Sequence, residues 1–63
     1  MTEAHFIVTV RYENGMFMIK AVEKQFETYN FVANNISSVV TKQFKITRDL
    51  KKVGVKAYFE YAD

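Results

Sequence analysis

Asn14 and Gly15 separate two segments with alternating side chains, and this arrangement constrains the fold more than any other feature of the chain. The segments, residues 5–12 and 16–22, follow a two-residue period, which is the period of a β-strand. Asn and Gly both accept positive φ angles, so they suit the two-residue type I′ turn of a β-hairpin. The chain is therefore predicted to begin with two antiparallel strands.

The predicted turn fixes a register, in which Val10 pairs with Ile19, and the register sorts the side chains. One face is then wholly apolar or aromatic: Phe6, Val8, Val10, Tyr12, Phe17, Ile19 and Ala21. The other face is mixed: Ile7, Thr9, Arg11, Met16, Met18, Lys20 and Val22. Without a second covering layer, the mixed face is either solvated or covered by a partner, which includes a second copy of the chain.

From Thr28 the period changes to steps of three and four residues, which is typical of an amphipathic helix. The residues of this stripe are Tyr29, Val32, Ala33, Ile36, Val39, Val40, Gln43 and Phe44. Thr28 is a suitable N-cap. Several intervening residues form helices weakly, so packing on the sheet has to hold the helix in place.

Two further strands complete the predicted α+β fold. Residues 53–61 alternate strongly and form the last strand, while residues 44–48 form a short third strand, extend the helix or run as a loop. The expected order is β-β-α-β-β, or β-β-α-β, with one helix packed on one face of a small antiparallel sheet. At 63 residues the chain forms a single domain, residues 1–63, around one core.

Composition limits the classes of function. The chain has no cysteine, so the sequence supports neither a disulfide nor a thiolate metal site, and no cofactor or metal is expected. Its N-terminal region lacks the features of a signal peptide, and no apolar run is long enough to cross a membrane. We therefore expect a cytoplasmic protein without a membrane partner, as a monomer or a homodimer.

Catalysis is not expected. His5 is the single histidine, and the sequence places no third residue beside a pair of His5 with Ser37 or Ser38. Gly15 and Gly54 are isolated, so no glycine-rich loop is available to hold a phosphate. The carboxylates lack the spacing of metal ligands. These features favour a binding protein over an enzyme.

Phe31 is the first candidate for partner binding. On the predicted helix it lies about 140° from the buried stripe, among small polar residues. An exposed aromatic side chain ringed by polar groups is typical of a binding hot spot, although local packing of Phe31 is the alternative. Asn34, Asn35 and Glu13 are expected to be exposed and are predicted to contact the same partner.

A basic segment, residues 42–56, is the second candidate, with Asp49 as its single acidic residue. Its cations could neutralise nucleic-acid phosphates, and Tyr58 could stack on a base. The alternatives are a solvated charged segment, or a patch that steers an acidic protein partner. The residues expected to contact nucleic acid are Lys45, Arg48, Lys51, Lys52 and Lys56.

Three segments together resemble the Dmd (discriminator of mRNA degradation) antitoxins of tailed bacteriophages: "YENGMFMIKAVEK", then "YNFVANN", then a short lysine-bearing C-terminal strand. The resemblance implies a phage antitoxin that binds a host toxin, an mRNA-cleaving endoribonuclease, and occludes its active-site groove in the host cytoplasm. Phe31 matches the aromatic residue at the start of the helix in that family. A small nucleic-acid-binding module is the alternative function.

Overall fold

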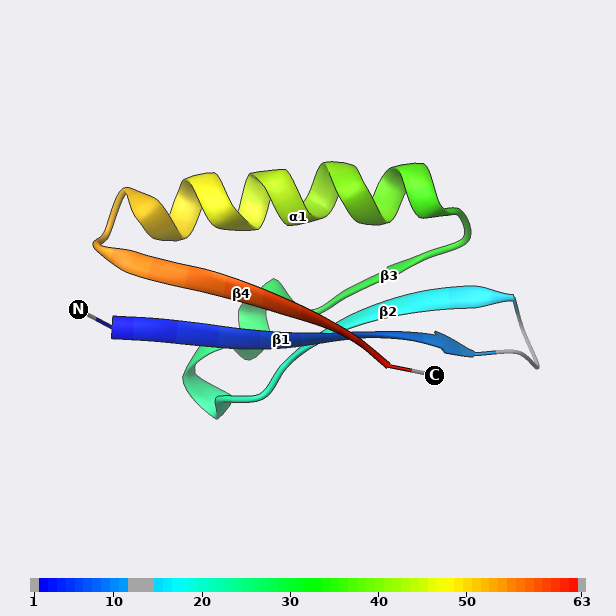
Figure 1. The fold of residues 1–63 in the computed structure, drawn as a ribbon, viewed down its shortest axis with the longest axis horizontal. Helices are drawn as coiled ribbons and strands as arrows, with labels where there is room; N and C mark the ends of the chain where they lie inside the picture. Colours follow the sequence, from blue (N-terminus) through cyan, green and yellow to red (C-terminus); the bar gives the residue numbers. More distant parts are fainter. Residues whose placement is uncertain (1, 12–14, 63) are drawn as a thin grey trace.

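In a computed structural model, which describes residues 2–11 and 15–62, the chain forms a four-stranded sheet with one long helix over one face (Figure 1). The predicted α+β class, with one helix packed on a small sheet, is confirmed. The elements are β1 (Thr2–Arg11), β2 (Met16–Ala21), the 3₁₀ helix η1 (Lys24–Tyr29), β3 (Phe31–Ala33), α1 (Ile36–Lys51) and β4 (Val55–Ala62). The strands lie in the order β3-β2-β1-β4.

The pairing of β1 with β2 differs from the predicted register by two residues, because Val10 pairs with Phe17 rather than with Ile19. The predicted turn falls partly on residues 12–14, which lie outside the described part of the chain. Arg11 pairs with Met16, so four residues separate the paired positions instead of the predicted two, and Gly15 among them has a positive φ angle of 59°. Since side chains alternate with a period of two, a shift of two residues leaves each side chain on its predicted face.

The helix predicted from Thr28 is wrong for its first eight residues. Residues 28–35 form the end of η1, the short strand β3 and a connection, and α1 follows them. Asn35 starts the helix: its backbone is extended (φ −151°, ψ 159°), and its side-chain oxygen accepts a hydrogen bond from the Ser38 amide at 2.9 Å. Asparagine is a better N-cap than threonine, and Phe31 and Val32 favour strands, so local preference supports the later start.

Residues 44–48 belong to α1, so the predicted third strand is wrong and the alternative of a longer helix is observed. Val39, Ile46 and Leu50 are buried at spacings of seven and four, as expected for one face of a helix. After α1, Gly54 takes a φ of 75°, and its amide donates to the Lys51 carbonyl at 3.1 Å. A glycine with positive φ commonly ends a helix, and here it directs the chain into β4.

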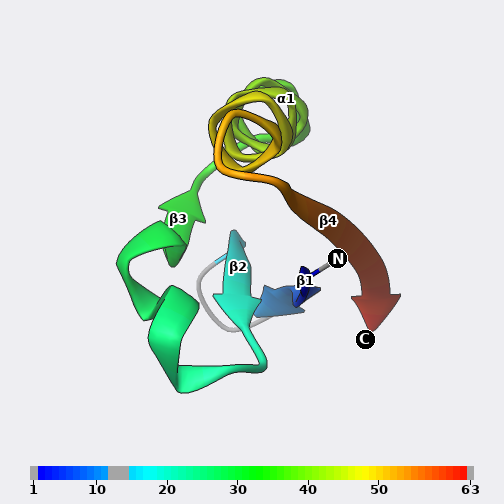
Figure 2. The same ribbon diagram turned by 90° about the vertical axis from the view of Figure 1, so that its left-hand side faces the viewer.

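β4 runs parallel to β1, so the sheet is mixed rather than antiparallel throughout. β3 and β4 are therefore parallel to each other and lie on opposite sides of the β2–β1 pair. Parallel strands need a crossover connection, and α1 supplies it by running over β2 and β1 (Figure 2). This connection explains why the helix covers the apolar face of the hairpin.

The core lies between α1 and that face. Its buried residues are Ala4, Phe6, Val8, Ile19, Phe26, Ala33, Val39, Ile46 and Leu50. Phe6 lies at its centre, stacked on Phe59 with ring centroids 5.4 Å apart and edge-to-face with Tyr29 at 6.4 Å. In the described part of the chain, no element covers the opposite face of the sheet (Figure 2).

Candidate binding surfaces

Phe31 does not lie on a helix, and the predicted helical surface around it is wrong. It is the first residue of β3, its side chain is half-buried, and it packs against the core. Phe31 pairs with Ile19, whose side chain points toward α1, so the phenyl ring lies on the helix side of the sheet. The Lys42 ammonium group lies 4.9 Å from its ring centroid. The cause is the later start of α1, which leaves residue 31 in a strand.

Asn34 and Asn35 lie in the connection between β3 and α1, and both are exposed. The side-chain oxygen of Asn35 caps the helix, and its side-chain amide donates to the Asn34 side-chain oxygen at 3.0 Å. A structural role for Asn35 is thus established independently of any partner. Glu13, the fourth residue predicted to bind a partner, lies outside the described residues.

Phe31 forms part of the floor of a shallow depression at the junction of β3 and α1. The depression is lined by Phe31, Ser37, Ser38, Thr41, Lys42 and Lys45. An aromatic floor with hydroxyl groups and two ammonium groups at the rim could accept a planar or acidic side chain of a partner. The residue singled out from the sequence therefore lies beside a surface hollow, although in a different setting from the predicted one.

The basic segment becomes regular because residues 42–51 are helical. At 100° per residue, four cations lie within about 60° of the direction opposite to the buried side of α1. They are Lys45, Arg48, Lys51 and Lys52, and all four are exposed. This set is named here the basic face. Lys42 points instead toward β3 and Phe31.

Phe44 lies within the basic face and is 73% exposed. With Thr41, Lys45 and Arg48 it surrounds a second shallow depression on the outer side of α1. Phe44 is predicted from the sequence to lie in the buried stripe, and that prediction is wrong. The seven- and four-residue spacing of Val39, Ile46 and Leu50 is the signal that locates the buried side, but it is visible only if residues 44–50 are read as helix.

Lys56 and Tyr58, the other residues predicted to contact nucleic acid, lie outside the basic face. Lys56, in β4, lines a hollow with Lys51 near the end of α1, so the structure brings these two together. Tyr58 is exposed as predicted, with the Lys56 ammonium group 5.1 Å from its ring centroid. It pairs with His5 on the sheet face away from α1, so Tyr58 does not join the basic face. Phe44 is the aromatic residue that lies beside the basic face.

Charge is separated between the helix and the rest of the chain. Residues 36–52 carry five basic groups and one acidic group, a net charge of +4, whereas all other residues together carry −2. The acidic group, Asp49, lies 3.8 Å from Arg48 Nε, and both side chains are partly or largely exposed. An exposed pair of this kind contributes little to stability, and it leaves the local charge strongly positive.

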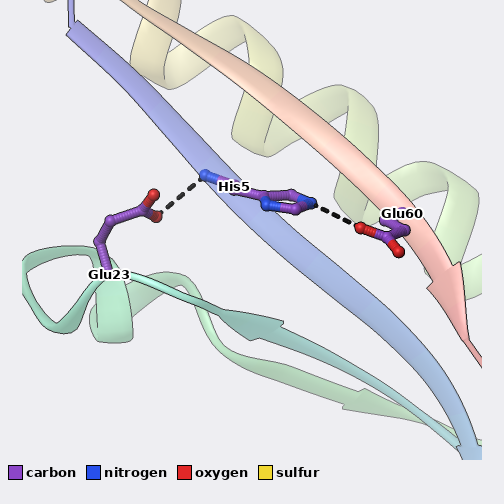
Figure 3. Close-up of polar contacts among 3 residues, drawn as sticks. All are labelled: His5, Glu23 and Glu60. Carbon is purple, nitrogen blue, oxygen red and sulfur yellow. Dashed lines mark hydrogen bonds and ion pairs between the residues drawn. The ribbon is translucent and has the colours of Figure 1, made fainter.

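His5 lies on the sheet face away from α1 and contacts two carboxylates (Figure 3). Its Nε2 atom is 3.1 Å from Glu60 Oε2, while its backbone amide donates to Glu23 Oε2 at 2.9 Å. The second bond continues the β1–β2 ladder, because Glu23 follows the point where β2 ends. Ser37 and Ser38 lie at the start of α1, across the sheet, so the structure does not bring either serine to His5.

Among residues 2–11 and 15–62, no group of three or more histidine, cysteine, aspartate or glutamate residues could hold a metal ion. The helices within these ranges are too short or too polar to cross a membrane.

Comparison with known proteins adds no relative. Neither a protein-family model, nor a curated protein, nor a solved structure matches the chain. The resemblance to the Dmd antitoxins accordingly stays a prediction from the sequence.

Proposed function

We propose that this is a small non-catalytic binding protein whose basic face binds nucleic acid, with single-stranded RNA as the preferred class. One observation carries the proposal: four exposed cations lie along the outer side of α1, and two of them, Lys45 and Arg48, adjoin the exposed ring of Phe44. Lysine and arginine neutralise phosphates without regard to sequence. An aromatic ring beside them can stack on an unpaired base, which is how many single-strand-binding proteins hold their ligand.

The positive charge of the basic face favours RNA over a protein partner whose contact surface is also basic. A groove that binds RNA phosphates is itself expected to be cationic, so the basic face would be repelled from the active-site groove of a ribonuclease. The RNA strand is the more suitable partner for this face. The helix is held by a core on its inner side, so its cations are presented at fixed spacings rather than on a loose loop.

Fluorescence anisotropy with a labelled single-stranded RNA of about 16 nucleotides tests the proposal. With about four phosphate contacts, the slope of log affinity against log salt should be near −3 between about 50 and about 200 mM salt. The double variant Lys45→Glu/Arg48→Glu should lose more than about tenfold in affinity and make the slope shallower. Lys24→Glu, on η1 and also exposed, is the matched control and should change neither.

Phe44→Ala separates stacking from charge. It should lower the affinity by about tenfold, since stacking on one base contributes about 1–3 kcal/mol, while the salt slope stays unchanged. A duplex of the same length should bind more weakly than the single strand, because its bases are not free to stack. Absence of binding to either RNA at low salt would exclude the proposed function.

The second candidate, which the Dmd resemblance supports, is an antitoxin that binds and occludes a host endoribonuclease toxin. The specific observation in its favour is the depression at Phe31, with Lys42 over the ring. Here the phenyl ring and the surrounding hydroxyl groups would receive a protruding side chain of the toxin, and the protein would act in the cytoplasm of the host cell. Of the four cations of the basic face, only Lys45 lines this depression.

An RNA-cleavage assay with a candidate toxin tests this second function. Phe31→Ala would also weaken the core, so Ser38→Arg is the sharper variant, because it fills the depression from its rim. Ser38→Arg should abolish inhibition, whereas Thr47→Arg, exposed on another side of α1, should not. If Ser38→Arg leaves inhibition unchanged, the depression is not the toxin-binding site.

A further inference from the structure

We infer that the sheet face away from α1 is a homodimer interface, on which a second copy packs about a two-fold axis parallel to β1. This inference is independent of the proposed function of α1. Six apolar or aromatic side chains lie on this face beside charged ones: Ile7, Met16, Met18, Val22, Val32 and Tyr58. Val22 and Val32 are 56% and 48% exposed.

Charge complementarity identifies the occupant. Ile7 pairs with Lys20 of β2 on one side and with Glu60 of β4 on the other. One row of side chains across the face therefore consists of a positive, an apolar and a negative residue. A 180° rotation about an axis along β1 exchanges the β2 and β4 sides of the second copy. Each Lys20 then lies opposite the second copy's Glu60, and Ile7 lies against its own counterpart. This row is thus complementary to itself.

The contacts between Lys20 and Glu60 can form even though two packed sheets are twisted relative to each other. Lys20 and Glu60 each lie one strand spacing, about 5 Å, from the axis. Aligned sheets pack at about −30°, which displaces groups at that radius by about 2–3 Å. Lysine and glutamate side chains can span this offset. Glu60 also contacts His5 through Oε2, and a carboxylate accepts hydrogen bonds at both oxygens, so Oε1 can receive the lysine.

Neighbouring rows agree with the same axis. Thr9 pairs with Met18 on one side and with Ala62 on the other, so the rotation places Met18 over the second copy's Ala62. His5 pairs with Tyr58, and its carbonyl accepts from the Val22 amide, so Tyr58 comes to lie over the second copy's Val22. Both contacts are apolar. In the row of Glu3 and Lys56, the rotation places Glu3 against its own counterpart, with a Lys56 of opposite charge on the neighbouring strand of each copy.

The area predicts a weak dimer. With the axis along β1, β2 lies over the second copy's β4, and β3 has no counterpart. The three strands that meet, β2, β1 and β4, are six, ten and eight residues long, so a spacing of about 4.8 Å gives a flat footprint of roughly 400 Å² per copy. Stable interfaces bury about 800 Å² per partner, so this face is below that size and in the range of weak, transient contacts. Dimerisation should therefore be detectable at tens to hundreds of micromolar, and incomplete below that.

Sedimentation equilibrium from about 10 µM to about 1 mM tests the inference, since the apparent mass should rise from 7.4 kDa toward twice that value. Lys20→Glu and Glu60→Lys each set like charges opposite one another twice per dimer, so each should weaken association by at least about tenfold. The double variant Lys20→Glu/Glu60→Lys restores opposite charges across the axis and should recover association to within about threefold of the unmodified chain.

Matched controls are Lys24→Glu and Glu27→Lys, which make the same charge changes at exposed positions on η1 and should leave association unchanged. Circular dichroism of each variant establishes that it is folded. Within one chain, residues 20 and 60 are about 10 Å apart, so an intrachain effect of the swap would alter unfolding rather than mass. A chain that stays monomeric at 1 mM overturns the inference, and so does a dimer whose single and double variants associate equally, because its contact would lie elsewhere.

Discussion

Two neighbouring residues of α1, Phe44 and Ile46, provide the sharpest test of how the helix sits on the sheet. Ile46 is 1% exposed, between the helix and the apolar face of the sheet, whereas the larger Phe44 is 73% exposed. We predict that Ile46→Ala strongly destabilises the protein and that Phe44→Ala does not. Residue size alone predicts the reverse order.

The magnitudes follow from burial. Truncating a buried isoleucine to alanine costs about 2–5 kcal/mol, because the transfer free energy is lost and a cavity remains. Phe44 keeps roughly a quarter of its surface from water, and full burial of a phenylalanine is worth about 1.5–3 kcal/mol, so its truncation costs about 0.4–0.8 kcal/mol. Alanine forms helices better than phenylalanine, which offsets about half of that cost.

Urea denaturation followed by circular dichroism measures both changes. A domain of this size has a free energy of unfolding of about 3–9 kcal/mol, so Ile46→Ala could leave little folded protein. Ile46→Val is therefore included, with an expected loss of about 0.5–1.5 kcal/mol and a lower midpoint at constant slope. If Phe44→Ala lowers the midpoint more than Ile46→Val does, the orientation of α1 on the sheet described here is wrong.

Three further predictions concern local features of the backbone. Asn35→Ala should destabilise the protein by about 1 kcal/mol in thermal unfolding because it removes the N-cap, whereas Asn34→Ala should have little effect. Gly54→Ala should cost about 1 kcal/mol by urea titration, since its φ of 75° is unfavourable for a residue with a side chain even though the space around it is open. Glu23→Ala should speed hydrogen exchange at the His5 amide, which loses its acceptor, and Glu23→Gln should largely preserve the protection. Equal exchange in both Glu23 variants would contradict this role of the carboxylate.

The surfaces show a clear limit of sequence reasoning. The alternation of residues 53–61 correctly predicted a last strand, observed as β4, and the lysines of residues 42–56 correctly marked a basic region. Phe31 and Phe44 were both misplaced, for one shared reason. A helix assigned too early and ended too soon has the wrong buried side, so the exposed aromatic and the half-buried one exchanged positions.

The sequence by itself determined which side chains share a face of each strand, because alternation depends only on the two-residue period. That assignment survived a change of two residues in the β1–β2 register. Tertiary structure alone decided that β4 runs parallel to β1, that α1 crosses over the hairpin to reach it, and that residues 31–33 extend the sheet. These outcomes depend on hydrogen bonds and packing between segments distant in the chain, and the free energy of such contacts is not encoded in the periodicity of either segment.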